Sequence, residues 1–209
     1  FNHFSSSLDT KFEVLKALGN YGSFVGSKLI DKTKLNNTPG RTRMGGLDRN
    51  DYDFKNKLVA DIGCGPFGGV FYNNMDSNII PIDILADDYN EMGHCGKKII
   101  MGDLYKGLLF EENYFDYVIC TNAIDHIPNV QDGFNEIFRI LNFGGVAFIH
   151  VHLRNNNQLS KGHIHQLDLD KVKNMISMFD DISVEEDADW VNDEAGRRAA
   201  YLILKKLSR

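Results

Sequence analysis

From Lys57 onward, short apolar runs alternate with stretches of helical periodicity. The apolar runs predict strands at 58–62, 78–83, 98–101, 116–121 and 145–151. The stretches between them predict helices near 66–75, 85–92 and 130–141. Such alternation is typical of α/β proteins, in which a parallel sheet is covered by helices on both faces.

Both ends of the chain depart from this alternation. After residue 167, Asp168 is expected to cap a helix that continues through Phe179. The runs ISVEE and AAYLILKK then follow without an intervening helix, which predicts an antiparallel hairpin at the end of the sheet. Helical patterns and a turn-rich segment precede the first strand. We therefore expect residues 1–55 to form an N-terminal helical cap or lid and residues 56–209 to form the core.

The segment LVADIGCGPFGG, residues 58–69, is the centre of the predicted fold. Gly63 and Gly65 let the backbone approach a ligand, and the helix that follows offers free N–H groups. Together with Gly68 and an acid about 20 residues on, Asp83, they also satisfy a dinucleotide fingerprint. Asp61 favours a different ligand, because a carboxylate beside the turn suits an ammonium group better than a pyrophosphate.

The motif DIGCGP resembles the first motif of class I S-adenosylmethionine-dependent methyltransferases. Acids that end later apolar runs, Asp83 in IIPIDI and Asp103 in IIMGDL, fit the same family. FDYVICTNAIDHIPNV and FNEIFRILNFGGVAFIHV are similar to its later motifs, although Asp125 stands where a Glu is usual. The similarity is closest to the small-molecule, type-11-like branch. It implies an α/β, Rossmann-like, mostly parallel seven-stranded sheet with helices on both faces and an antiparallel last strand.

The resemblance also implies S-adenosylmethionine as the cofactor. The residues expected to bind it are Asp61, Gly63, Cys64, Gly65, Asp83, Ile84, Asp103, Leu104 and Asn122. By this resemblance, Asp61 and the glycines hold the methionine end of the cofactor, and Asp83 holds the ribose. Asp103 and Leu104 border the adenine, and Asn122 lies near the carboxylate or methyl-bearing region. The alternative for Asp83 and Asp103 is a helix cap or a turn. Cys64 is expected to contribute its backbone rather than a nucleophilic thiol.

Histidines are the candidate catalytic groups. His126 and His152 are expected to act on the acceptor, because a neutral imidazole can take a proton; the alternative for His126 is a loop contact. In HVHL, His150 and His152 share one face of a strand, and His163 and His165 follow a polar loop. Substrate contact, a metal site and simple exposure are all open for these four. We predict no metal site, because the Cys or close helical His spacing typical of zinc is missing.

Composition limits the partners rather than the fold. The net charge of −6 argues against a nucleic-acid partner, and 43% hydrophobic residues are ordinary for a globular domain. Three widely spaced cysteines favour a reducing compartment. Without a membrane-length apolar run or a signal-peptide pattern, we expect a cytoplasmic protein with no membrane partner. The chain begins with Phe1 rather than Met, so upstream residues are expected.

The sequence thus predicts a methyltransferase that uses S-adenosylmethionine to methylate an O or N atom of a small molecule. The expected partner is the small-molecule acceptor, and a homodimer is compatible with the sequence. Arg41, Arg43 and Arg154 suit a carboxylate or phosphate on that acceptor, or are solvated loop charges. Two other functions stay open: a catalytically inactive cofactor-binding or regulatory protein, and an NAD-type oxidoreductase.

Overall fold

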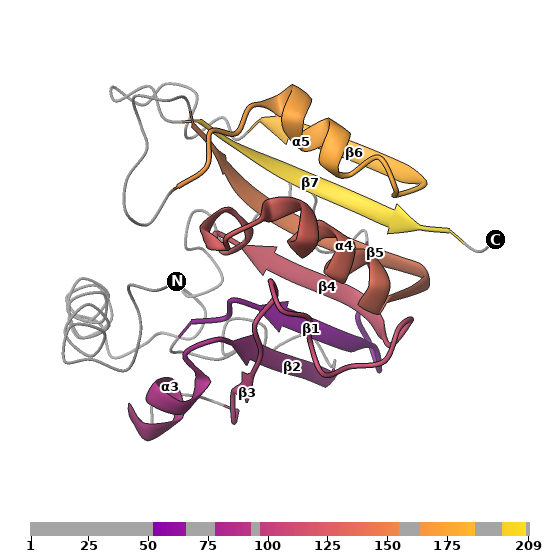
Figure 1. The fold of residues 1–209 in the computed structure, drawn as a ribbon. Helices are drawn as coiled ribbons and strands as arrows, with labels where there is room; N and C mark the ends of the chain where they lie inside the picture. The colour runs from indigo at the N-terminus through magenta and orange to yellow at the C-terminus, as the bar shows by residue number, and fades with distance from the viewer. Residues whose placement is uncertain (1–51, 66–77, 93–96, 155–163, 187–197, 208–209) are drawn as a thin grey trace, which may run out of the picture. The chain divides into compact units, whose positions relative to one another are not determined.

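The computed structural model describes residues 52–65, 78–92, 97–154, 164–186 and 198–207 (Figure 1). The chain divides into two compact units, Phe1–Thr42 and Arg43–Arg209, and every described residue belongs to the second. The predicted N-terminal helices and the helix predicted at 66–75 lie outside the described residues.

The described residues form a seven-stranded sheet. Its strands are β1 (Leu58–Ile62), β2 (Asn78–Asp83), β3 (Ile100–Met101), β4 (Phe115–Thr121), β5 (Leu141–Leu153), β6 (Asp181–Glu186) and β7 (Arg198–Lys206). Their order across the sheet is β3-β2-β1-β4-β5-β7-β6. Strands β1 to β5 pair in parallel, whereas β7 is antiparallel to both β5 and β6. The predicted fold class, with its antiparallel last strand and C-terminal hairpin, is confirmed.

Short helices connect these strands. Those in the described residues are α3 (Ala86–Met92), the short 3-10 helix η3 (Ile124–His126), α4 (Val130–Ile140) and α5 (Leu169–Met175). Asn129 caps α4 by accepting from the Gln131 amide at 3.1 Å. Asp168 caps α5, as predicted, by accepting from the Lys171 amide at 2.8 Å. Among the described helices, none has the length and apolar character needed to span a bilayer.

Strand β3 is shorter than the predicted 98–101 because the backbone of Ile99 bonds elsewhere. The Ile99 amide donates to Asn90 Oδ1 at 2.9 Å, and Asn90 Nδ2 donates back to the Ile99 carbonyl at 2.8 Å. The side chain of Asn90 on α3 thus takes the place of a strand partner at Ile99, and pairing with β2 begins at Ile100.

Two other boundaries also differ from the prediction. Helix α5 ends at Met175 rather than Phe179, because the chain turns there and buries Phe179 edge-on against Phe138, with ring centroids 5.2 Å apart. Strand β5 begins at Leu141 rather than 145, directly after α4. The register with β4 is irregular at this start, since Leu141 pairs with Phe115 and Val146 pairs with Tyr117, and Gly144 between them has a φ of 78°.

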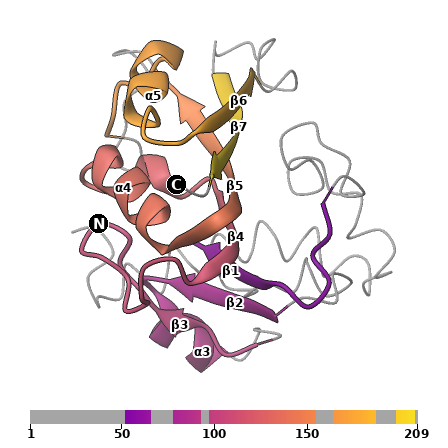
Figure 2. The ribbon, with the colours of Figure 1, turned by 90° about the vertical axis from the view of Figure 1, so that its right-hand side faces the viewer.

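Alternating side chains place apolar residues on both faces of the sheet. In Figure 2, α4 and α5 lie on one face. Residues on the helix-covered face include Ala60, Ile62, Val118, Cys120, Ala147 and Ile149. Those on the other face include Val59, Ile119, Val146 and Phe148, and they pack with Phe54 and Tyr52. Residues 52–54 therefore contact the sheet, and the predicted boundary between cap and core at residue 55 stays a prediction.

Candidate functional site

The site predicted from the sequence lies along the carboxyl ends of neighbouring parallel strands. The order β3-β2-β1-β4-β5 means that the chain leaves β1 toward one edge of the sheet and returns at β4 on its other side. In open α/β sheets, ligands bind outside the carboxyl ends of the strands at this reversal. The residues that follow β1, β2 and β4 therefore form the candidate site.

The turn after β1 needs glycine at position 63. Gly63 has a φ of 68°, and its amide donates to the carbonyl of Ile82 at 2.8 Å. A Cβ on Gly63 would lie 2.3 Å from the Cβ of Ala123, which follows β4. Gly65 also has a φ of 68°, but a Cβ there would meet nothing within 4 Å. The turn thus packs tightly against the end of β4 at Gly63 and is open at Gly65.

Asp83, at the end of β2, holds this turn. Its Oδ2 accepts from the Gly65 amide at 3.0 Å, and its Oδ1 accepts from the Leu85 amide at 2.9 Å. The side chain is buried, and burial raises the pKa of Asp83 despite these hydrogen bonds from backbone amides. A carboxylate offers about four acceptor positions, so Asp83 can hold the turn and still accept from ligand hydroxyls. The next residue, Ile84, is half-buried.

Asp61 on β1 and Asp125 in η3 are both buried acids. Burial, followed by the negative charges of Asp125 and Asp61, raises the pKa of the Cys120 thiol, so both carboxylates lie near that sulfur. Cys120 therefore stays protonated and is a poor nucleophile. Cys64 is also buried, and its Sγ lies 3.4 Å from the Gly65 carbonyl.

Asp103 follows β3 and makes the contacts of a turn acid. Its Oδ1 accepts from the Tyr105 amide at 3.0 Å, and its Oδ2 lies 3.4 Å from Lys106 Nζ. Leu104 beside it is buried in the core. The turn alternative is thus realised at Asp103, and the contact of Asp103 and Leu104 with adenine stays a prediction.

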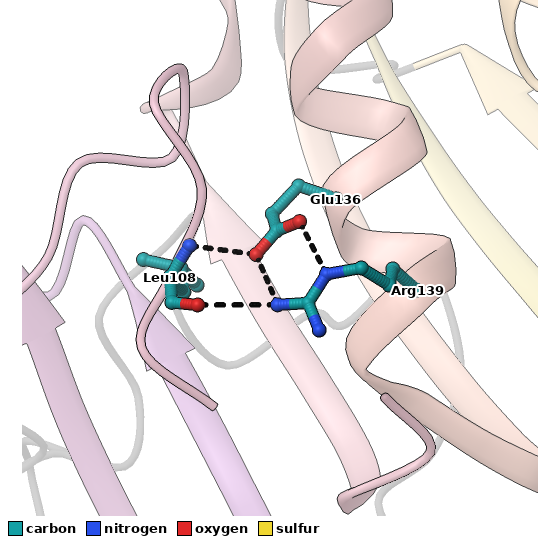
Figure 3. A network of polar contacts seen from close by, with 3 residues as sticks. All are labelled: Leu108, Glu136 and Arg139. Carbon is teal, nitrogen blue, oxygen red and sulfur yellow. Dashed lines mark hydrogen bonds and ion pairs between the residues drawn. The ribbon is translucent and has the colours of Figure 1, made fainter. Parts of the chain in front are cut away.

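A polar network ties the segment after β3 to α4 (Figure 3). Glu136 Oε1 accepts from the Leu108 amide at 2.6 Å, and Arg139 donates to both carboxylate oxygens at 2.7 Å. Arg139 also donates to the Leu108 carbonyl at 3.1 Å. Both backbone groups of Leu108 are therefore held by α4, which fixes the loop that carries Asp103.

Asn122 follows β4 and adopts the left-handed region, with a φ of 55°. Its amide donates to the His150 carbonyl at 3.1 Å, and its side-chain Oδ1 is hydrogen-bonded to His150 Nδ1. The His150 ring also packs on Tyr201, with centroids 4.6 Å apart. Asn122 thus joins the ends of β4 and β5, and its side chain is exposed.

The predicted catalytic histidines come together with one acid. His152 Nδ1 lies 3.1 Å from Asp125 Oδ2, and both side chains are buried. One donor atom each of Asp125, His126 and His152 lie within 4.8 Å of one another. We refer to these three residues as the Asp125–His126–His152 cluster.

The four histidines singled out in the sequence do not act as one group in the described part of the chain. His150 and His152 share one face of β5, as predicted, with ring centroids 5.5 Å apart. His165 Nε2 instead contacts the Ile127 carbonyl at 2.6 Å. His163, Arg41 and Arg43 lie outside the described residues.

Asp125 is the residue of this site that sequence reasoning left without a role. It was noted only as the replacement for a Glu before His126. A signal was present, because Asp125 is an acid between Ile124 and Ile127, shortly after an apolar strand. Its partner on β5 is 27 residues away, so only the sheet brings the two together.

This chain is similar in sequence to known methyltransferases. The family described as methyltransferase domain matches residues 60–149. An uncharacterized protein of Methanocaldococcus jannaschii is 38% identical over 102 residues, which are 47% of this chain and 43% of that protein. Sterol 24-C-methyltransferase of Saccharomyces cerevisiae is 30% identical over 117 residues, 50% of this chain and 28% of that enzyme. The chain thus spans less than half the length of these two relatives.

A solved structure shows the same fold. The S-adenosylmethionine-dependent methyltransferase from Archaeoglobus fulgidus aligns with a TM-score of 0.60 and 16% identity, over 89% of this chain and 99% of that one. The strand order, the glycine turn after β1 and the family match are all typical of a methyltransferase domain. Residues 60–149 match the methyltransferase domain family, and the strand order agrees with the fold of the class I, S-adenosylmethionine-dependent type.

Proposed function

We propose that this chain is an enzyme that transfers a methyl group from S-adenosylmethionine to an O or N atom of a small molecule. The observation that carries the proposal is the contact between the ends of β1 and β2, where Asp83 Oδ2 accepts from the Gly65 amide at 3.0 Å. This contact sets a buried carboxylate beside an open glycine at the reversal point of the sheet, which suits a ligand with vicinal hydroxyls.

The residues proposed to bind the cofactor are Asp61, Gly63, Cys64, Gly65, Asp83, Ile84, Asp103, Leu104 and Asn122. Asp61, buried at the end of β1, suits the ammonium group of the methionine end. Asp83 would accept from the ribose hydroxyls, and Asp103 with Leu104 would border the adenine. The buried carboxylates accept hydrogen bonds and the backbone amides donate them, a combination that fits such a ligand. When bound, S-adenosylmethionine supplies a methyl group already activated on a sulfonium.

His126 and His152 are the proposed acceptor-side groups. His126 lies with Asp125 in η3, which follows β4, and His152 lies near the carboxyl end of β5, within 4.8 Å of both by one ligand atom each. An imidazole there suits an acceptor that gives up a proton as it is methylated.

The strand order supports a methyltransferase over an NAD-type oxidoreductase. Strand β7 enters antiparallel between β5 and β6, whereas a dinucleotide-binding domain would continue with parallel strands in the order 3-2-1-4-5-6. The glycine fingerprint that both classes share does not separate them.

The test is a transfer assay with S-adenosylmethionine that carries a radiolabelled methyl group. The purified chain is incubated with panels of phenols, aliphatic alcohols, amines and alkenes of metabolite size, and label in the product is counted. Transfer to a phenol, alcohol or amine is the expected result. Binding of S-adenosylhomocysteine without transfer to any member would favour the regulatory alternative. Absence of cofactor binding would overturn the proposal.

A further inference from the structure

The contact between Asp125 and His152 joins two buried side chains of the proposed acceptor side. Asp125 is 2% exposed and His152 is 7% exposed, and His152 Nδ1 lies 3.1 Å from Asp125 Oδ2. A buried charge of this kind is kept only where it is paired or hydrogen-bonded. The contact therefore fixes the orientation of the imidazole ring.

The sheet, rather than a local turn, brings the pair together. Thr121 at the end of β4 pairs with His150 on β5, and the Asn122 amide donates to the His150 carbonyl at 3.1 Å. The next residues turn into η3, where the His126 amide donates to the Ala123 carbonyl at 3.1 Å. Asp125 thus projects from η3 toward the residue two places along β5 from His150. Because these backbone contacts belong to the central strands, the pair is rigidly held.

The chemistry of the contact selects one form of the ring. An ionised carboxylate only accepts hydrogen bonds, so the neutral imidazole of His152 must carry its proton on Nδ1. The lone pair is then on Nε2. This is the tautomer in which an imidazole can take a proton from a reacting group, and the carboxylate stabilises the imidazolium that results.

We propose that Asp125 is a positioning residue, which holds His152 as the general base for an acceptor that bears an O–H or N–H group. The inference rests on the proposed methyl transfer. In the step, a lone pair of the acceptor atom forms a bond to the methyl carbon as the carbon–sulfur bond breaks. The electron pair of that bond stays on sulfur, and the acceptor proton passes to His152 Nε2. An alkene acceptor has no O–H or N–H proton, so it could not give such a proton to His152 from the methylated atom.

A divalent cation held by the Asp125–His126–His152 cluster is the competing explanation. Two imidazoles and a carboxylate are a known ligand set for transition metals. The Asp125–His152 contact, however, has the length of an ordinary hydrogen bond. The experiments below separate the two explanations.

The first experiment reads the tautomer directly and needs no acceptor. Long-range 15N–1H correlation spectra of the full chain are recorded at neutral pH, with ring signals assigned from His152→Ala and His165→Ala. His152 is expected as the Nδ1–H form. His165 is an internal reference with the opposite expectation, because its Nε2 must donate to the Ile127 carbonyl at 2.6 Å. Asp125→Asn should change the His152 signals, whereas Asp125→Glu should keep the Nδ1–H form. An Nε2–H form of His152 in the unmodified chain would overturn the proposal.

The second experiment uses whichever phenol, alcohol or amine is methylated in the panel. Asp125→Asn should lower kcat at least about 100-fold and leave the Kd of S-adenosylhomocysteine within about twofold. Asp170→Asn, on the exposed first turn of α5, is the matched control and should leave kcat unchanged. The double variant Asp125→Asn with His152→Ala should be no slower than His152→Ala alone, because residues that act as one unit are not additive.

Each contrary outcome has a distinct meaning. If the losses of Asp125→Asn and His152→Ala multiply, Asp125 does not act through His152 and the proposal fails. If chelator treatment abolishes transfer and Zn²⁺ or Mn²⁺ restores it, the cluster is a metal site and the proposal also fails. If S-adenosylhomocysteine does not bind at all, the proposed function fails, while the tautomer spectra still decide whether Asp125 orients His152.

Discussion

Asp83 Oδ2 accepts a hydrogen bond from the Gly65 amide at 3.0 Å, so the acid that ends β2 holds the turn that follows β1. The sequence left open whether Asp83 is a turn acid or a ligand for the cofactor. The geometry allows both, because two of about four acceptor positions are used by backbone amides. A carboxylate that is already held by the turn is also pre-oriented for the ligand.

Replacing Asp83 with Ala should weaken the binding of S-adenosylhomocysteine about 10- to 100-fold. The variant removes the proposed ribose contact and frees the Gly65 turn, and hydrogen bonds to charged groups contribute about 1.5–3 kcal/mol each. Calorimetry on the folded variant measures the change. Asp87→Ala on the exposed first turn of α3 is the control and should bind as the unmodified chain does. Unchanged affinity in Asp83→Ala would remove Asp83 from the cofactor site.

Gly63→Ala should destabilise the domain by about 2–5 kcal/mol. A Cβ there would lie 2.3 Å from the Cβ of Ala123, and the φ of 68° disfavours any L side chain by about 1–2 kcal/mol, with overpacking adding about 1–3 kcal/mol. Gly65→Ala is the matched control, because it shares the φ but meets nothing within 4 Å. It should lose only about 1–2 kcal/mol in urea denaturation.

A second substitution tests the cause of the loss at Gly63. Ala123→Gly in the Gly63→Ala background removes the opposing methyl group and should recover the packing part, about 1–3 kcal/mol. The single variant Ala123→Gly serves as the reference. No recovery would mean that backbone strain alone accounts for the loss.

Glu136→Gln should remove an acid-sensitive part of the stability. Burial raises the pKa of Glu136, but the hydrogen bonds from Arg139 and the Leu108 amide outweigh this effect and hold the pKa below its ordinary value. As the pH falls, the unfolded chain therefore takes up this proton before the native protein does. The stabilisation is complete above the ordinary Glu pKa of about 4.3 and is lost as the pH falls through the lower native pKa.

The measurement for Glu136 is urea denaturation at several pH values. At pH 7 the Gln variant should be less stable by about 1–3 kcal/mol, and the difference should shrink below pH 4. Glu185→Gln on the exposed edge strand β6 is the control, with a change below about 0.5 kcal/mol. A difference that stays constant with pH would mean that the charge of Glu136 is not what stabilises the loop.

Lys206→Met should cost about 2–4 kcal/mol of unfolding free energy. Lys206 Nζ donates to the carbonyls of Phe138 and Leu141 at 2.8 and 2.9 Å, at the carboxyl end of α4, and to Asn113 Oδ1 at 2.7 Å. Leaving buried acceptors unsatisfied costs about 1–3 kcal/mol each. Lys205→Met is the control, since its ion pair with Asp181 is exposed and contributes about 0–1 kcal/mol. Equal effects of the two substitutions in urea denaturation would contradict this account.

The parallel strands could be predicted because each is an apolar run bounded by polar residues. The antiparallel hairpin was predicted from the missing helix between ISVEE and AAYLILKK, and it is confirmed by the pairing of β6 with β7. The errors in the predicted strand and helix boundaries have local causes that the hydrophobic pattern does not show. Ile99 fits a strand by its hydrophobicity, but its backbone amide and carbonyl are hydrogen-bonded to the side chain of Asn90.

Contacts between distant residues were the part that the sequence could not supply. Nothing in the pattern links Asp125 to His152 or Lys206 to the end of α4, because these contacts depend on strand order and register. Asp61 and Asp83 could be selected as candidate cofactor ligands from the sequence, because a motif with fixed spacing contains them. Asp125 carries no such spacing to its partner.

The most direct test of the account is calorimetric titration of the purified chain with S-adenosylhomocysteine and, separately, with NADH. The account predicts saturable binding of S-adenosylhomocysteine at one site per chain and no detectable heat with NADH. Binding of NADH without binding of S-adenosylhomocysteine would contradict the assignment of the strand ends to a methyl donor.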